Sequence, residues 1–148
     1  ETFTALDAAA RSIEADRSIR AVILRGAGEN FCAGIDLGVL QGGGEDSVKA
    51  LLAPVEGSPA NLAQRAAYAW RELPIPVICA LQGIAFGGGF QIAMGADLRY
   101  AAADVRMSIM EAKWGLIPDM AITTTLRHVV APDLAKELAF TAGVFDAQ

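Results

Sequence analysis

The sequence is poor in the side chains that most often carry metal-dependent, redox or hydrolytic chemistry. A single histidine, His128, excludes a histidine-rich metal centre. The two cysteines, Cys32 and Cys79, stand far apart in apolar stretches and form no CxxC pair, so we expect two buried, reduced thiols. The patterns GxSxG, HExxH and GxxxxGK[ST] are all missing, which removes the commonest hydrolase and nucleotide-binding motifs.

Basic residues are also scarce, because 12 Lys and Arg face 17 Asp and Glu and leave a net charge of −5. Nucleic-acid surfaces need clustered Lys and Arg, so this balance argues against a nucleic-acid partner. Residues 1–16 are too acidic for a signal or transit peptide, and we expect a cytoplasmic protein. The uncharged run at residues 73–96 is long enough to cross a bilayer, but its prolines and glycines would break such a helix, so no membrane contact is expected.

At 148 residues the chain has the length of one domain, and its apolar segments alternate between helical and strand-like patterns. Helices are expected over residues 2–15, 62–73, 88–95, 119–130 and 132–142, the last one ended by Gly143, and buried strands over 21–24, 77–81, 97–101 and 106–109. This alternation predicts an α/β domain with a largely parallel sheet. Residues 42–59, rich in glycine and proline, are expected to form a mobile surface loop with about one helical turn.

Both ends of the sequence are unusual for such a fold. No strand precedes the helix expected at residues 2–15, and a new helix is expected to begin at Phe145. We therefore expect residues 1–148 to form a single core domain that belongs to a longer protein.

Two glycine-containing turns follow strands and are candidates for chemistry. The first spans residues 31–37 after the strand at 21–24, and the second spans residues 83–89 after the strand at 77–81. Small residues let the backbone approach a ligand, and a helix that starts there adds positive potential. Two such turns at neighbouring strand ends can aim two N–H groups at one oxygen, as an oxyanion hole does. A plain tight loop is the alternative for either turn, and a dinucleotide-binding turn at residues 26–31 is disfavoured because it lacks the third glycine.

These two turns, in this order and with an acidic residue 20 positions after Gln91, resemble the crotonase (enoyl-CoA hydratase/isomerase) superfamily. Ala33-Gly34-Ile35-Asp36-Leu37 is similar to its first oxyanion motif, residues 83–89 to its second, and residues 110–118 to the segment that carries its catalytic glutamate. The resemblance runs from about Ala21 to the end of the chain, apart from the expected loop. It implies a crotonase-like spiral of ββα units, expected here to lack its first strand or strands and its C-terminal helices.

The resemblance also implies what the protein binds and how it assembles. It implies an acyl-CoA thioester as the substrate, no separate cofactor, no metal site, and a homotrimer or dimer of trimers for the full-length protein. The backbone N–H groups of Ile35 and Gly88 would hold the thioester oxygen, where an enolate charge develops. The catalytic acids that it implies are Glu111 and Asp119. The residues that it places at the substrate are Ala33, Asp36, Gly87 and Gln91.

Proton handling separates the activities within this superfamily. Its hydratases carry glutamates at the positions of Gln91 and Glu111, but an amide cannot exchange a proton near neutral pH. Its dienoyl-CoA isomerases carry acids at the positions of Glu111 and Asp119, together with an aspartate where this chain has Gln91. The sequence therefore resembles the isomerase branch most, and a shift of double bonds from the 3,5 to the 2,4 positions is expected. The alternatives are an enoyl-CoA hydratase that uses Glu111 alone and an inactive acyl-CoA-binding homologue.

Each candidate side chain also has an interpretation that needs no catalysis. Asp119 could cap the helix expected to begin at that residue. Glu111 could be a solvated carboxylate near Lys113. Gln91 could serve packing alone, and Asp36 could fix the conformation of its own loop.

Overall fold

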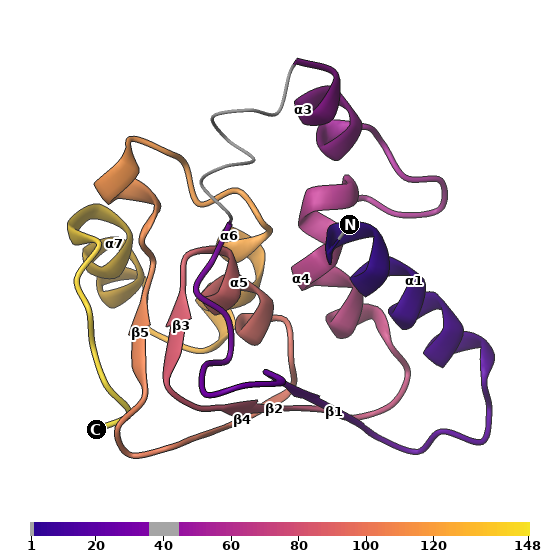
Figure 1. Ribbon diagram of the computed structural model, residues 1–148, viewed down its shortest axis with the longest axis horizontal. Helices are drawn as coiled ribbons and strands as arrows, with labels where there is room; N and C mark the ends of the chain where they lie inside the picture. Colours follow the sequence, from indigo (N-terminus) through magenta and orange to yellow (C-terminus); the bar gives the residue numbers. More distant parts are fainter. Residues whose placement is uncertain (1, 36–44) are drawn as a thin grey trace.

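Helices and short strands alternate along the computed structural model, which describes residues 2–35 and 45–148 and, within these, the side chains of all residues except 45–48. Helix α1 (Thr2–Ala15), strand β1 (Val22–Arg25) and helices α3 (Glu45–Leu52) and α4 (Leu62–Glu72) come first. They are followed by β2 (Val77–Leu81), β3 (Ile84–Phe86), α5 (Gly88–Met94), β4 (Leu98–Ala101), β5 (Arg106–Ser108), the 3-10 helix η1 (Glu111–Trp114), α6 (Ile122–Thr125), the 3-10 helix η2 (Leu126–His128) and α7 (Pro132–Thr141) (Figure 1).

The strands form two parallel sheets joined by a repeating connection. Strands β1, β2 and β4 form the first sheet in that order, and β3 and β5 form the second, which rises from the first in Figure 1. Cys32 extends the second sheet through a parallel bridge to Ala85. Each pass of the chain therefore gives one segment to each sheet before a helix: β1 and Cys32, then β2 and β3 before α5, then β4 and β5 before α6. The predicted α/β class and ββα spiral are confirmed.

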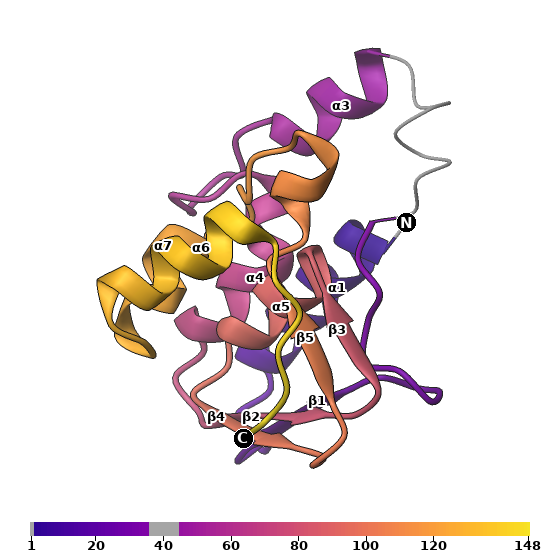
Figure 2. The same ribbon diagram turned by 90° about the vertical axis from the view of Figure 1, so that its left-hand side faces the viewer.

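Small side chains let helix α4 lie close to its neighbours. Ala66, Ala67 and Ala69 are buried, and Trp70 fills the space beside them while its indole N–H donates to the Ala66 carbonyl at 2.9 Å. Helix α4 packs against both α1 and α5 (Figure 2). A side chain at Gly95, the residue after α5, would overlap the Ala67 carbonyl, so this crossing tolerates only glycine without a shift of backbone.

A buried guanidinium ties α1 to α4. Arg65 on α4 is 7% exposed and hydrogen-bonds the carboxylates of Asp7 on α1 and Glu72 at the end of α4. Burial alone would favour the neutral acid, but the hydrogen bonds from Arg65 and Arg11 outweigh it and lower the pKa of Asp7. The first helix is thus held by charge as well as by the packing of Ala10.

The expected length of the helix over residues 119–130 is wrong, because the structure has a shorter helix there. Ala121 has a left-handed backbone with φ +62°, so α6 begins only at Ile122, and it passes into η2 after Thr125. Three consecutive threonines are poor helix formers, and the Thr125 hydroxyl donates back to the Ala121 carbonyl. The N-cap position of α6 is Ala121, which means that the interpretation of Asp119 as the helix cap is also wrong.

Four further expectations need correction. The second glycine turn contains strand β3, because the residues between its glycines pair with β5. Helix α3 fills two turns within the expected loop. Phe145 does not start a helix, since it exchanges two backbone hydrogen bonds with Met107 and packs its ring edge-on against Phe90. The left-handed residue that ends α7 is Ala142, one residue before the expected Gly143.

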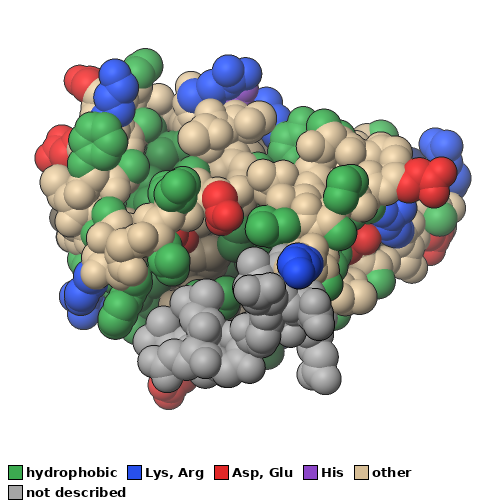
Figure 3. Space-filling model, turned by 90° about the horizontal axis from the view of Figure 1, so that it is seen from above, with side chains coloured by type: hydrophobic (Ala, Val, Ile, Leu, Met, Phe, Trp, Pro, Cys, Tyr) green, Lys and Arg blue, Asp and Glu red, His purple; other side chains and the backbone are tan. Residues whose placement is uncertain are grey.

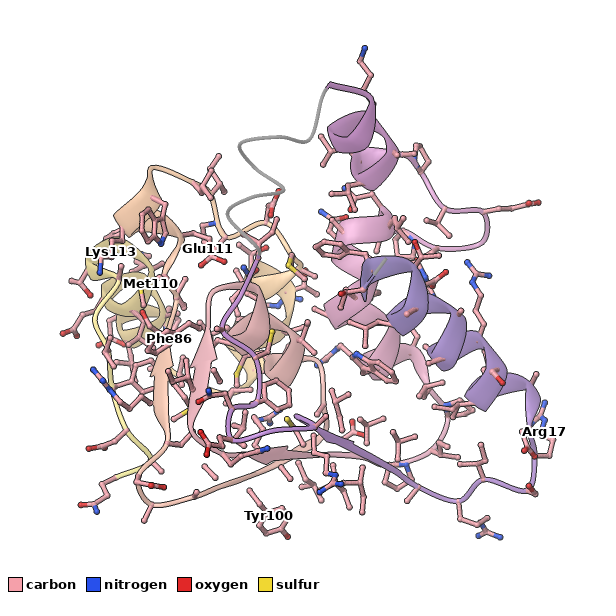
Figure 4. The ribbon with its side chains drawn as sticks, viewed as in Figure 1. Arg17, Phe86, Tyr100, Met110, Glu111 and Lys113 are labelled. Carbon is pink, nitrogen blue, oxygen red and sulfur yellow. The ribbon has the colours of Figure 1, made fainter. Side chains whose placement is uncertain are left out.

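Within the described ranges no helix is both long enough and apolar enough to cross a membrane. The uncharged run at residues 73–96 instead supplies β2, β3 and α5. The face of the first sheet that lies away from the helices exposes Ile23, Leu98 and Tyr100, the last of which points away from the body of the protein in Figure 4.

Candidate active site

The two glycine turns lie side by side. The Cys32 N–H donates to the Ile84 carbonyl, the Phe86 N–H donates to the Cys32 carbonyl, and both bonds measure 3.0 Å. The segment that leads to Gly34 therefore runs along β3 as an extra strand of the second sheet. The sequence predicts that the two turns lie at neighbouring strand ends, and these hydrogen bonds confirm that they are adjacent.

Glycines allow the turns to approach each other closely. A Cβ atom at Gly89 would lie 2.7 Å from the Cβ of Cys32, closer than real Cβ atoms come. Gly34 has φ +100°, and a Cβ there would lie 3.0 Å from the Phe86 carbonyl oxygen and 3.9 Å from the Gly88 nitrogen. The Gly88 N–H sits in the first turn of α5, where backbone donors have no partner within the helix. The predicted oxyanion donors, Gly88 and Ile35, thus belong to backbone segments in direct contact.

Glu111 lies at the same place. Gly87 has φ +53°, its N–H donates to the Ser108 carbonyl at 3.0 Å, and a Cβ there would lie 3.3 Å from Oε1 of Glu111. The carboxylate therefore lies against the residue that precedes the expected oxyanion donor Gly88. Figure 4 shows Glu111 near the ends of β3 and β5, and Figure 3 shows the molecule from above, looking toward these strand ends.

Gln91 connects the acid to the following segment. Its Nε2 donates to Oε1 of Glu111 at 2.5 Å, and its Oε1 accepts from the Met120 N–H at 2.9 Å. Gln91 is only 1% exposed and is therefore shielded from solvent. Both ends of the amide are thus engaged, and Gln91 is part of the site rather than of remote packing.

The second oxygen of Glu111 is free. Oε2 is buried and has no hydrogen-bond partner among the described residues. Burial raises the pKa of Glu111, the nearby charge of Asp119 adds to the rise, and hydrogen bonding, that of Gln91 included, offsets it only in part. The interpretation of Glu111 as a solvated carboxylate is wrong, and the Lys113 ammonium instead lies over the Trp114 ring at 5.9 Å.

The raised pKa of Glu111 predicts how stability changes with pH. Above the ordinary value of 4.5 the folded protein keeps a proton that the unfolded chain has lost, so the wild type should lose stability as pH rises through this window. Glu111→Gln removes the titration. Its free energy of unfolding, measured in urea, should exceed that of the wild type at pH 7 and approach it below pH 4.5. Glu137→Gln, on an exposed part of α7, is the control, and an equal gain there would contradict the prediction.

Three predicted site residues remain to be placed. Asp119 is exposed, and it immediately precedes Met120, whose N–H is bound by Gln91. Ala33 is also exposed, on the segment between Cys32 and Gly34. Asp36 lies outside the described residues.

No metal site emerges from the parts of the chain that the structure describes, where no three His, Cys, Asp or Glu residues cluster. The Cys79 thiol is not expected to react as a thiolate, because burial raises its pKa to about 12. The site brings together the segments of the two predicted backbone donors, a glutamate with one buried oxygen, an amide and an exposed acid.

Comparison with known proteins identifies the family of this chain. A sequence model described as "Enoyl-CoA hydratase/isomerase" matches residues 1–148, the whole chain. The chain belongs to the enoyl-CoA hydratase/isomerase family. Its fold is that of an enoyl-CoA hydratase from Bacillus anthracis, with a TM-score of 0.86 at 32% identity over 99% of this chain and 54% of that one.

Curated members of the enoyl-CoA hydratase/isomerase family with different activities are about equally similar to it. The mitochondrial methylglutaconyl-CoA hydratase of Mus musculus is 32% identical over 144 residues, which cover 97% of this chain and 43% of the relative. The 1,2-epoxyphenylacetyl-CoA isomerase of Escherichia coli K12 is 36% identical over 138 residues, which cover 93% of this chain and 51% of the relative. The chain thus spans about half the length of these relatives. The cytoplasmic location and the trimeric assembly stay predictions.

Sequence reasoning missed Met120 as part of the site of this family member. Its N–H binds Gln91, and its Sδ would lie 3.0 Å from a Cβ at Gly88. The available signal was its position directly after Asp119, but a methionine before an apolar segment is ordinarily core. Only the fold brings it over the first turn of α5.

Proposed function

We propose that the protein acts on acyl-CoA thioesters as an isomerase that shifts double bonds from the 3,5 to the 2,4 positions of a dienoyl chain. One observation carries the proposal: Gln91, which hydrogen-bonds Glu111 and the Met120 N–H, is an amide and cannot exchange protons, so among the described residues Glu111 and Asp119 are the acids beside it. The environments of these acids differ, because Oε2 of Glu111 is buried whereas the Asp119 side chain is exposed.

The turns would stabilise the intermediate. Removal of a proton from C2 of the thioester creates an enolate, whose negative charge develops on the carbonyl oxygen. The N–H groups of Ile35 and Gly88 would donate to that oxygen, and such a donor is typically worth about 3–4 kcal/mol in the transition state. Because both donors belong to the backbone, the arrangement is fixed by the contact between the turns rather than by side-chain rotamers.

The two acids would divide the proton transfer. Asp119, whose side chain is exposed, takes the proton from C2, and the electron pair spreads from the enolate along the diene. Burial raises the pKa of Glu111, and in its protonated form Glu111 donates the proton of Oε2 to C6, which leaves double bonds at the 2 and 4 positions. Asp119 then releases its proton to solvent and Glu111 takes one up. The product therefore has the same composition as the substrate.

A pair of substrates tests the proposal. Purified protein is given a 3,5-dienoyl-CoA and, separately, a 2-enoyl-CoA, and the ultraviolet absorbance of each is followed. The proposal expects growth of the conjugated 2,4-dienoyl absorbance. Loss of the 2-enoyl absorbance through water addition would favour the second candidate, a hydratase, to which the similarity with methylglutaconyl-CoA hydratase points. Binding of both thioesters without turnover would contradict both activities.

Asp119→Asn should lower turnover of the dienoyl-CoA at least about tenfold, a threshold set below the 10²–10⁴-fold that a general base typically contributes. Its side chain is exposed and makes no hydrogen bond within the described ranges, so the free energy of unfolding should change by less than about 0.5 kcal/mol. Asp104→Asn, another exposed carboxylate in the turn between β4 and β5, serves as the control in both measurements. Unchanged turnover in Asp119→Asn would remove this residue from the mechanism.

A further inference from the structure

Gln91 is placed to control Glu111. It projects from α5, is almost fully buried, and reaches two groups from two other segments: the Glu111 carboxylate of η1 and the Met120 N–H that precedes α6. Its two hydrogen bonds join the segments that carry the buried and the exposed acid.

The orientation of the Gln91 amide follows from its partners. A backbone N–H can only donate, so the amide atom that faces Met120 must be the oxygen. The NH₂ group therefore faces Glu111 and occupies Oε1 as an acceptor. When Glu111 is protonated, the oxygen that accepts this bond is the carbonyl oxygen of its carboxyl group, and the acidic hydrogen then belongs on Oε2, the atom without a partner.

We infer that Gln91 is a positioning residue, which fixes the Glu111 carboxyl so that its transferable proton resides on Oε2, the buried oxygen without a partner. The inference rests on the proposed function for the fate of that proton, but the hydrogen-bonded arrangement can be measured without any substrate. It gives the amide a task that a glutamate could not perform while ionised, since a carboxylate has no hydrogen to donate.

Infrared spectroscopy tests the arrangement directly. The C=O stretch of the protonated Glu111 carboxyl is identified as the band that Glu111→Gln removes. Gln91→Met keeps the size of the side chain but removes the donor, so this band should move to higher wavenumber. An unmoved band in Gln91→Met would overturn the inference. Gln64→Met is the matched control, because the Gln64 side chain also makes a hydrogen bond, accepting from the Asn61 N–H at the start of α4, far along the chain from the site.

A measurement on the unaltered protein covers the case in which Gln91→Met does not fold. In protein labelled with nitrogen-15, the side-chain N–H signals of Gln91 should shift with pH in step with the titration of Glu111, whereas those of Gln64 should not. Gln91 signals that stay constant while Glu111 titrates would overturn the inference.

Kinetics then connect the arrangement to turnover. In Gln91→Met the kcat for the dienoyl-CoA should fall about tenfold or more, and KM should change less than about twofold, because the amide acts through the acid rather than on the substrate. If the infrared band moves but the wild type isomerises nothing, the proposed function fails and the positioning role stands. If the wild type isomerises and Gln91→Met matches it in band and kcat, the positioning role fails alone.

Discussion

Glu111→Gln should lower the kcat for the dienoyl-CoA by about 10²–10⁴-fold, the contribution expected of a general acid. An amide of the same shape can still accept the hydrogen bond from Gln91, but it cannot release the proton that C6 requires. KM should change little, because in the proposed mechanism the thioester oxygen would be held by backbone N–H groups rather than by Glu111. The measurement is steady-state turnover at several pH values, with binding of a saturated acyl-CoA as a separate readout.

The same variant should be more stable than the wild type at neutral pH, since the buried carboxyl is an unfavourable place for a charge. Loss of turnover together with a gain in stability is typical of a residue kept for chemistry. Exposed Glu137→Gln should show neither effect. Full turnover in Glu111→Gln would mean that another group delivers the proton.

Gly89→Ala should lower turnover by about 10²–10³-fold, the cost of one lost oxyanion donor. The new methyl group would fall within 2.7 Å of the Cys32 side chain and closer still to its carbonyl, which forces α5 and the first turn apart. The overpacking should also cost about 1–3 kcal/mol of stability. Turnover and urea unfolding are therefore measured on the same preparations.

Two other glycines separate the catalytic effect from the structural one. Gly95→Ala at the opposite end of α5 also collides with backbone, that of Ala67, so it should destabilise the protein without moving the turns. Gly28→Ala faces open space and should be nearly neutral. Equal losses of turnover in Gly89→Ala and Gly95→Ala would show that general destabilisation, not the oxyanion site, causes the effect.

Much of the fold could be predicted because periodicity is local. The apolar run of β2 and the helical spacing of α4 each identify their element without reference to distant residues. The failures have non-local causes. Strand β3 is only three residues long between glycines, and nothing near it in sequence announces β5 as its partner. The late start of α6 goes with the left-handed backbone of Ala121, which follows Met120, and the Met120 N–H is bound by Gln91, 29 positions away in the chain.

The same distinction between local and non-local causes separates what could be predicted of the site from what could not. The turns, Glu111 and Gln91 could be identified from motif resemblance, because their residue types and spacing are fixed in the chain. The task of Gln91 could not, because it depends on which atoms face Glu111 and Met120 after folding. Motif spacing likewise carries no information on the free Oε2 of Glu111, since burial is a property of the packed structure.

The infrared spectrum of a bound thioester tests the central claim most directly. A non-reacting acyl-CoA labelled with carbon-13 at its carbonyl is bound to the wild type and to Gly89→Ala. Two backbone donors on one oxygen should move the C=O stretch in the wild type to a wavenumber below its value in water, and Gly89→Ala should reverse much of this shift. A stretch that stays at its aqueous value in the wild type would show that the N–H groups of Ile35 and Gly88 do not share that oxygen.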